Sequence, residues 1–332
     1  RGCSAGAYFS TQSSTLPAAI KTGRLTMATG SIVQRVLTNR DGTRATGVEV
    51  IDAATRQVRT IKARIVFLCA STIETVRLLL MSNSDRHPQG LANSSGLVGK
   101  YVMDHHVSDI AATSVPGGLT SHKTGYRPIP LFVPRFRNVG EKREDYVRGY
   151  MLNSGAAMED WSRGTRMEGV GAGFKHALRK TGSWSLILIA QCETLPRAEN
   201  TIALDPSKRD SWGLPVPKLD VSWGENDLKM RKEAGDSCVE MLTKAGYEGV
   251  ARIPTDPVPG SAIHEMGGAV MGRDKRTSVL DANNRAHDLP NLFITDGAAM
   301  SSSGSVNPSL TYMALTARAA AFAAAEAHAG RL

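Results

Sequence analysis

Three kinds of pattern are missing from this sequence, and each absence excludes a class of protein. The four cysteines, Cys3, Cys69, Cys192 and Cys238, are widely scattered and form no Cys-x-x-Cys pair, so a disulfide framework is not indicated. No apolar run approaches the roughly 20 residues that a membrane-spanning helix needs. The formal net charge of +9 is spread along the chain without a long basic block. Since no recognition motif accompanies this charge, nucleic acid binding is not expected.

What remains is the composition of a globular protein. The 332 residues are 41% hydrophobic and 21% charged, which is typical of one large domain or two ordinary ones. The positive charge has two interpretations, a solvated basic surface or attraction to an anionic partner or membrane surface. The sequence does not choose between them.

The chain also lacks the usual signals of an N-terminus and of a dinucleotide site. It begins with Arg1-Gly-Cys, without an initiating Met or a signal-peptide pattern, and we therefore expect the C-terminal part of a longer polypeptide. The glycine-rich stretch 169–173 follows no buried strand, and no acidic residue ends a second strand at the expected distance. We interpret that stretch as a loop.

The first hundred residues contain a junction typical of α/β proteins. Residues 64–70 form a continuous apolar run, as in strands buried on both faces. A helix is predicted over 71–82, with Ser71 and Glu74 in the spacing of a capping box. Helix amides at such a junction lie at the carboxyl edge of a sheet, where α/β proteins bind nucleotides. Upstream, we expect a helix over 13–23, ending at Gly23, then strands within 25–37 and 45–52 joined by a turn at 39–42.

The sequence pattern is different between residues 107 and 263. Short strand-like segments alternate there with Gly, Pro and Asn, and one long helix is predicted over 225–245. The strand-like segments are 185–192, 201–204 and 219–223. We expect an antiparallel sheet inserted into the first domain, and a return to that domain at His264 with a final helix over 308–327.

Three sequence elements follow one another near the C-terminus. His264 opens His-Glu-Met-Gly-Gly-Ala-Val-Met-Gly, an apolar run follows that ends at Asp296 and Gly297, and Asn307 opens Asn-Pro-Ser-Leu-Thr-Tyr-Met-Ala-Leu. This order resembles the closing segment of the glucose-methanol-choline (GMC) flavoprotein oxidoreductases.

The resemblance extends into the first hundred residues. The segment 31–36 resembles the family strand whose backbone, at the position of Val33, contacts the FAD adenine. The segment 67–80 resembles the second family signature, with Ser71 at its usual Gly and Val76 at its usual Pro. The segment 97–106 is similar to the family's Gly-x-x-x-x-Asp-His segment. With residues 264–327, these stretches cover about half of the chain.

The resemblance implies an α/β fold of two domains with FAD as cofactor. Its FAD-binding, Rossmann-like domain would comprise residues 1–106 and 264–332, and the inserted antiparallel-sheet, substrate-binding domain residues 107–263. The N-terminal fingerprint of the family is expected to be missing from this chain. The implied cofactor-binding residues are Val33, Asp296, Gly297, Pro308 and Ser309.

His264 and Asn307 are the predicted catalytic residues. Oxidation of an alcohol at a flavin removes the hydroxyl proton while hydride leaves carbon, and an imidazole has a suitable pKa for taking that proton. The amide of Asn307 can hydrogen-bond the same oxygen. A structural alternative is that Asn307 caps the last helix, with Pro308 at its first position.

Cys3 has a separate interpretation. The sequence from Cys3 to Thr15 resembles the stretch of bacterial FAD-dependent sugar dehydrogenases in which a cysteine cluster holds an iron–sulfur centre. Such clusters need three or four thiolates, so the other ligands would lie outside this chain. The alternative is an ordinary free thiol.

The predicted function is oxidation of a secondary hydroxyl of a sugar or glycoside to a ketone, and the resemblance is strongest to the bacterial glucoside 3-dehydrogenases. Two alternatives stay open, an oxidase that passes electrons to oxygen and a flavin-free fragment that serves as a binding or assembly module. The expected partners are the substrate, an electron acceptor (a cytochrome, quinone or dye), a small subunit and the preceding segment. A periplasmic or peripheral membrane location is favoured over a cytoplasmic one.

Overall fold

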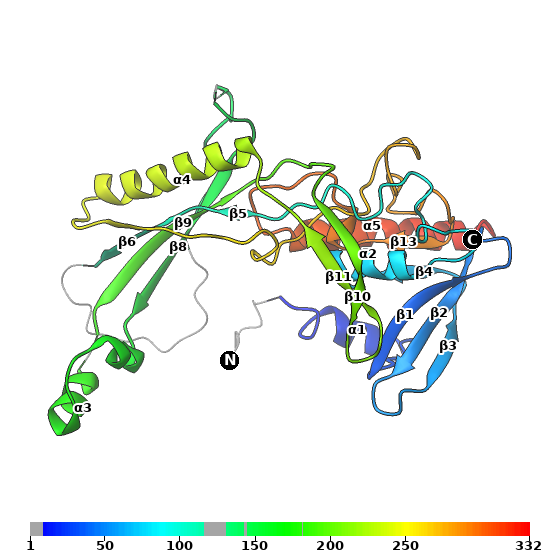
Figure 1. The fold of residues 1–332 in the computed structure, drawn as a ribbon, viewed down its shortest axis with the longest axis horizontal. Helices are drawn as coiled ribbons and strands as arrows, with labels where there is room; N and C mark the ends of the chain where they lie inside the picture. The colour runs from blue at the N-terminus through cyan, green and yellow to red at the C-terminus, as the bar shows by residue number, and fades with distance from the viewer. Residues whose placement is uncertain (1–8, 116–130, 143–144, 181) are drawn as a thin grey trace.

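The computed structural model describes residues 9–115, 131–142, 145–180 and 182–332. Cys3 lies outside them. The fold is mixed α/β, and the elements form two groups around two hydrophobic cores, one at each end of the elongated molecule in Figure 1. Within the described residues, no helix is long and apolar enough to cross a membrane.

A three-stranded antiparallel sheet opens the first group. Its strands, preceded by the short helix α1 (Thr15–Lys21), are β1 (Ser31–Thr38), β2 (Ala45–Asp52) and β3 (Val58–Lys62). The turn between β1 and β2 is closed by a bond from the Gly42 amide to the Asn39 carbonyl, and Gly42 has the positive φ of +72° that favours glycine. The predicted helix, strands and turn of this region are thereby confirmed, and β3 is an additional strand.

The first core is built where distant segments meet. Strands β4 (Val66–Leu68) and β13 (Leu292–Ile294) pair in parallel although more than 200 residues separate them. Helix α2 (Thr72–Met81) follows β4 and contributes the fully buried side chains of Val76 and Leu79 to the same core. A third helix, α5 (Ser309–His328), packs Ala319 and Ala323 near Phe293.

The start of α2 corrects one prediction. Ser71 precedes the helix as expected, but its side chain makes no capping bond. Its backbone has φ of +71° and ψ of +161°, a region that glycine occupies far more readily than other residues. Serine therefore stands where the chain turns in a way suited to glycine, and the capping box is wrong because Ser71 does not have the extended backbone of a capping residue.

A six-stranded antiparallel sheet forms the second group and confirms the expected architecture of the middle region. Four strands run in the order β12-β6-β9-β8, β7 lies beyond β8, and β5 pairs with β9. Helix α4 packs across β6 and β9 (Figure 1). The bounds are β5 (His106–Val107), β6 (Ile110–Ser114), β7 (Phe132–Val133), β8 (Tyr150–Met158), β9 (Trp184–Cys192), α4 (Glu225–Lys244) and β12 (Ala251–Ile253).

Two further pieces belong to the middle of the sequence. The hairpin of β10 (Thr201–Arg209) and β11 (Pro215–Asp220) packs on α2, and Ile202 is part of the first core. Residues inside the stretch 107–263 thus also contact the first group, and the proposed domain boundaries stay a prediction.

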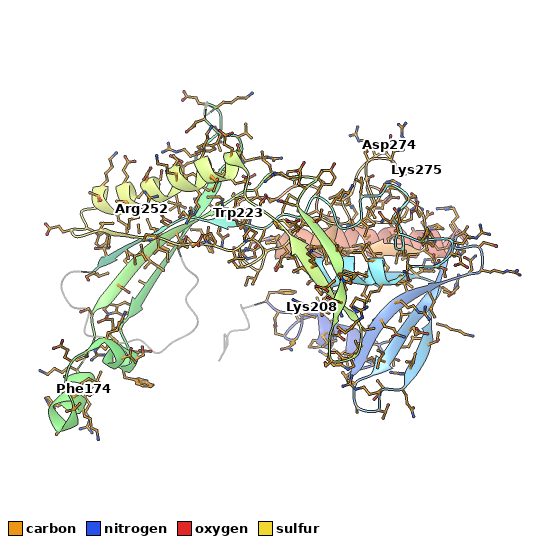
Figure 2. All side chains as sticks on the ribbon, in the orientation of Figure 1. Phe174, Lys208, Trp223, Arg252, Asp274 and Lys275 are labelled. Carbon is orange, nitrogen blue, oxygen red and sulfur yellow. The ribbon has the colours of Figure 1, made fainter. Side chains whose placement is uncertain are left out.

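The glycine-rich stretch was predicted to be a loop, and this is wrong for its last three residues. Helix α3 (Gly171–Arg179) begins with them and packs against the short 3-10 helix η1 (Trp161–Arg166). Leu178 and Phe174 contact Gly164, so packing between the two short helices offsets the low helix propensity of the glycines. Figure 2 shows Phe174 at the extremity of the molecule, far from the first core.

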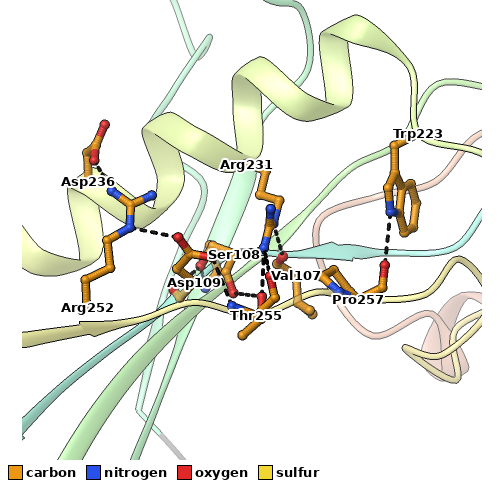
Figure 3. Close-up of polar contacts among 10 residues, drawn as sticks. Val107, Ser108, Asp109, Trp223, Arg231, Asp236, Arg252, Thr255 and Pro257 are labelled. Carbon is orange, nitrogen blue, oxygen red and sulfur yellow. Dashed lines mark hydrogen bonds and ion pairs between the residues drawn. The ribbon is translucent and has the colours of Figure 1, made fainter.

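The segment that leads from β12 to His264 is fixed by polar contacts (Figure 3). Asp109 accepts bonds from Arg231 at 2.9 Å, from Arg252 at 2.8 Å and from the Thr255 amide at 3.1 Å. The indole of Trp223 donates to the carbonyl of Pro257 at 3.1 Å. These contacts join the segment to α4 and to the strands beneath it, so His264 follows a well-anchored stretch of chain.

Candidate active site

His264 and Asn307, 43 positions apart in sequence, are in direct contact. The Nδ2 atom of Asn307 lies 2.7 Å from Nε2 of His264. Asn307 precedes α5, whereas His264 follows the loop after β12. The structure thus brings together the two residues predicted to handle the substrate, and their catalytic roles stay a prediction.

Asp104 fixes the backbone around His264. One carboxylate oxygen accepts from the amides of His105 at 2.9 Å and His264 at 3.1 Å, and the other accepts from the amide of Ala262 at 2.9 Å. Burial raises the pKa of Asp104, and the three amide bonds oppose that rise. Within the described residues, the carboxylate bonds main-chain amides and no imidazole ring, so the ring of His264 is oriented by other groups.

His105 supplies that orientation. Its Nδ1 atom lies 3.0 Å from Nδ1 of His264, and its Nε2 atom lies 2.6 Å from the carbonyl oxygen of Gly304. The side chain is almost wholly buried, and burial lowers the pKa of His105 to about 4. His105 is therefore neutral at physiological pH.

The environment of His264 also favours a neutral ring. Partial burial lowers the pKa of His264 from its usual value, and the negative charges of Asp104 and Glu265 oppose this effect. A histidine with a lowered pKa is unprotonated at neutral pH and can accept a proton.

A cavity of about 450 Å³ lies next to Asn307. Its floor is one face of the sheet formed by β7, β8 and β9, and its lining residues besides Asn307 are Phe132, Asn153, Ser154, Gly155, Ile187, Ile189 and Gln191. Within the described part of the chain, the buried side-chain oxygens of Asn153 and Gln191 have no hydrogen-bond partner. Buried polar atoms usually have one, so this cavity fits a ligand that brings hydrogen-bond donors.

The predicted cofactor residues Asp296 and Gly297 follow β13. The carboxylate of Asp296 accepts from Thr75 Oγ1 at 2.5 Å and from the amide of Ala298 at 3.0 Å. A Cβ atom on Gly297 would overlap the Glu265 carbonyl, so only glycine fits there. These contacts join the end of β13 to α2 and to the segment of His264, and the proposed FAD contacts stay a prediction.

The start of α5 corrects the alternative role of Asn307. The helix begins at Ser309, Pro308 stands at the cap position, and no side chain of the described residues caps the helix. Asn307 lies one residue too early, and its amide bonds His264 instead. The hydroxyl of Tyr312, in the first turn of α5, is buried and has no partner among the described residues.

Val33, the remaining predicted cofactor residue, lies in β1. It is partly buried and packs against the first core, in a different sheet from the one beneath the cavity. Its predicted contact with the adenine stays untested.

Comparison with known proteins decides the family. Residues 1–107 match the N-terminal family model of GMC oxidoreductases, and residues 196–316 match the C-terminal one. The chain belongs to the GMC oxidoreductase family. The family's N-terminal fingerprint was expected to be missing from this chain. The match corrects this expectation, because residues 1–107 represent the N-terminal family domain.

The relatives include dehydrogenases of small hydroxyl compounds. The chain is 35% identical to 2-methyl-1,2-propanediol dehydrogenase of Mycolicibacterium austroafricanum, over 83% of this chain and 50% of the relative. It is 34% identical to the fructose dehydrogenase large subunit of Gluconobacter japonicus, over 80% of this chain and 48% of the relative. The chain spans about half the length of these curated relatives.

Solved structures share the fold. Pyridoxine 4-oxidase from Mesorbium loti superposes with a TM-score of 0.58 at 20% identity, over 97% of this chain and 62% of that one. A formate oxidase gives a TM-score of 0.63 at 15% identity, over 89% of this chain and 60% of that one. Family membership supports FAD as the cofactor, whereas nothing in these comparisons supports an iron–sulfur cluster.

Residue-by-residue interpretation of the sequence missed several parts of the site. Asp104 and His105 belong to a motif noted for its resemblance alone, and their contacts with His264 depend on pairing across 159 residues. Asn153 and Gln191 lie on strands β8 and β9, and the register between these strands sets which side chains line the cavity. Residues 185–192 are apolar almost throughout and show no alternation that could have revealed this face.

Proposed function

We propose that this chain is part of an FAD-dependent oxidoreductase that oxidises a secondary hydroxyl of a sugar or glycoside to a ketone. The observation that carries the proposal is the contact of Asn307 with Nε2 of His264, beside a cavity in which two amide oxygens have no partner among the described residues. A base, a hydrogen-bond donor and a polar binding surface are thus adjacent in a member of a redox family.

The residues around α5 fit a flavin. The uncapped helix leaves backbone amides at Ser309 and beyond free to donate, and the positive end of the helix dipole favours electron-rich groups. The buried, unpaired hydroxyl of Tyr312 supplies one more donor. Pro308, Ser309 and Tyr312 would hold the cofactor here, with Asp296, Gly297 and Val33 as the further predicted contacts. When bound, FAD accepts the hydride from the carbon that carries the hydroxyl.

His264 takes the hydroxyl proton in this proposal. Its lowered pKa favours the neutral ring at neutral pH, and the substrate C–OH becomes C=O as its proton transfers to Nε2 and its hydride leaves the carbon. The Asn307 amide, which contacts Nε2 in the ligand-free structure, would donate to the substrate oxygen once the substrate hydroxyl takes its place at Nε2. Asp104 keeps the His264 backbone in place.

The cavity supports a substrate rich in hydroxyl groups. Each unpaired oxygen of Asn153 and Gln191 needs a donor, and a sugar presents several O–H groups at a spacing suited to neighbouring strands. The fructose dehydrogenase relative has a sugar substrate by its name. Oxidation at carbon 3, giving a 3-keto sugar, is the finer part of the proposal.

We further propose an acceptor other than oxygen, such as a cytochrome, a quinone or a dye. The two relatives at 35% and 34% identity are named dehydrogenases, and one is named a large subunit. A small partner subunit and a periplasmic or membrane-peripheral location extend this proposal. The rival oxidase would form peroxide under air, whereas a dehydrogenase would reduce the dye and form none.

The test is anaerobic bleaching of the flavin by a panel of sugars and glycosides, followed by stopped flow. The protein should be yellow, and His264→Ala should slow flavin reduction by about 10²–10⁴-fold, the usual cost of losing a general base. His176→Ala, on α3, is the matched control and should reduce flavin at the wild-type rate. A colourless folded protein would support the flavin-free module, and a fast His264→Ala would remove His264 from the mechanism.

A further inference from the structure

Four groups near the cavity form a continuous line of hydrogen bonds. The carbonyl of Gly304 contacts Nε2 of His105, Nδ1 of His105 contacts Nδ1 of His264, and Nε2 of His264 contacts Nδ2 of Asn307. The three distances are 2.6, 3.0 and 2.7 Å. Each contact needs one proton between its two atoms, so the donor in each contact can be deduced in turn.

The Gly304 carbonyl determines which nitrogen of His105 carries the ring proton. A carbonyl oxygen only accepts, so Nε2 of His105 carries a proton and donates to Gly304. His105 is almost wholly buried and neutral at physiological pH. A neutral imidazole has one ring proton, and Nδ1 of His105 is therefore an acceptor.

The second ring follows from the first. The acceptor at Nδ1 of His105 requires a donor, so His264 carries its proton on Nδ1. A neutral His264 then has a lone pair on Nε2. The amide nitrogen of Asn307 donates to that lone pair. Every contact in the line then joins one donor to one acceptor.

We propose that His105 is a positioning residue that holds His264 in the tautomer protonated at Nδ1, so that Nε2 faces the cavity side as the base. This inference rests on the proposed function, because it assigns the tautomer of the base named there. Without an acceptor at Nδ1, the single ring proton of His264 is shared between its two nitrogens, and the form protonated at Nε2 is inactive as a base.

An uncharged partner has a specific consequence for the base. A carboxylate bonded to the ring would favour the imidazolium and raise the pKa of His264. Here Asp104 bonds backbone amides, and the charges that act on His264 are those of Asp104 and Glu265, with His105 neutral against the ring. The ring is thereby oriented by a group that adds no negative charge of its own.

Two substitutions separate the two contacts of His105. In His105→Asn the shorter amide reaches the position of Nδ1 and can present its oxygen to His264. In His105→Gln the longer amide reaches the position of Nε2, can donate to Gly304, and leaves no acceptor for His264. The two variants therefore differ in the contact that sets the tautomer.

The primary measurement needs no substitution at His105. In protein labelled with ¹⁵N-histidine, the ring signals of His264 are assigned by their loss in His264→Ala. We expect the shifts of a ring protonated at Nδ1 in the wild type and in His105→Asn, and averaged shifts in His105→Gln. A wild-type ring protonated at Nε2 would overturn the proposal whatever the variants do.

Turnover supplies the second readout. We expect His105→Gln to lower kcat on the order of 10–100-fold, as loss of an orienting partner of a histidine does, with KM and the melting temperature unchanged and His105→Asn close to wild type. Equal losses in both folded variants, or none in His105→Gln, would contradict the inference. If His264→Ala proves fully active, the proposed function fails, whereas the ¹⁵N shifts still decide the tautomer.

Discussion

At the scale of single residues, Asn153 and Gln191 hold buried oxygens that are unpaired in the described structure. An unpaired buried acceptor costs about 1–3 kcal/mol, and replacing it with an apolar group of similar shape is neutral or stabilising. A substrate hydroxyl would satisfy the same oxygen. The free energy that these unpaired oxygens cost the folded protein is therefore recovered when a substrate hydroxyl binds to them.

We therefore predict opposite effects of Asn153→Leu and Gln191→Leu on stability and on binding. Each variant should raise KM for the sugar up to about tenfold, the value of one hydrogen bond, while its melting temperature stays equal or rises. Steady-state kinetics and thermal melts check both. Ile187→Leu, in the same lining, is the control and should leave KM unchanged. A KM equal to wild type in both variants would exclude these oxygens from substrate binding.

Asn307→Asp tests the partner of the base. Because Asn307 does not cap α5, the change should leave the melting temperature nearly unchanged. A carboxylate beside Nε2 favours the imidazolium, so the pKa of His264 should rise and the activity profile should move to higher pH. We expect kcat to fall at least about tenfold at neutral pH, the scale of general-base loss. An unshifted pH profile measured with saturating sugar and dye would contradict this role.

The predictability of the site differs among its residues for physical reasons. His264 and Asn307 lie in local motifs whose residue types alone indicate a catalytic role. His105 acts through a contact with a residue 159 positions away, and Asn153 and Gln191 face the cavity because of the β8–β9 register. Such placements depend on long-range pairing, and no short window of sequence contains them.

At the scale of elements, the junction between β4 and α2 combines good and poor sequence signals. The apolar run and the helical pattern after it predict both elements. The capping-box spacing misleads, because Ser71 adopts a positive φ and donates its amide to the Asp296 carboxylate. Likewise β4 and β13 were identifiable as apolar runs, whereas their parallel pairing required the whole fold.

Ser71→Gly should stabilise this junction. The backbone strain of a non-glycine residue in this region is about 1–3 kcal/mol, and the extra flexibility of glycine in the unfolded chain removes about 0.5–1 kcal/mol of the gain. We expect the free energy of unfolding to rise by about 1 kcal/mol in urea titrations. Ser71→Ala keeps the strain and loses only the hydroxyl, so it should not stabilise. A gain in Ser71→Ala equal to that in Ser71→Gly would place the effect in the hydroxyl instead of the backbone.

At the scale of the whole molecule, two adjacent histidines couple stability to pH. His105 and His106 are both almost wholly buried, and burial lowers the pKa of each to about 4. His106 also stacks on Trp223, with ring centroids 4.0 Å apart. In the unfolded chain the pKa of each histidine returns to about 6.5.

The sign of the coupling follows from proton counts. Between about pH 6.5 and about 4 the unfolded chain binds protons that the folded chain excludes, so the free energy of unfolding falls as pH falls. Burial raises the pKa of carboxyls such as Asp104 and Asp227, and these groups act in the opposite direction. Their effect begins near their ordinary values of about 4 and extends up to their raised folded-state values, so they offset part of the loss caused by the histidines.

We predict that each histidine removes about 2 kcal/mol of stability between pH 7 and pH 5. Urea unfolding at the two pH values measures the net change. His106→Phe keeps an aromatic ring against Trp223 and removes one titrating group, so its loss between the two pH values should be about 2 kcal/mol smaller than that of the wild type. His176→Phe, at an exposed position on α3, is the control and should lose as much stability as the wild type. If His106→Phe lost as much stability as the wild type between the two pH values, the acid sensitivity would have to originate outside the His106–Trp223 stack.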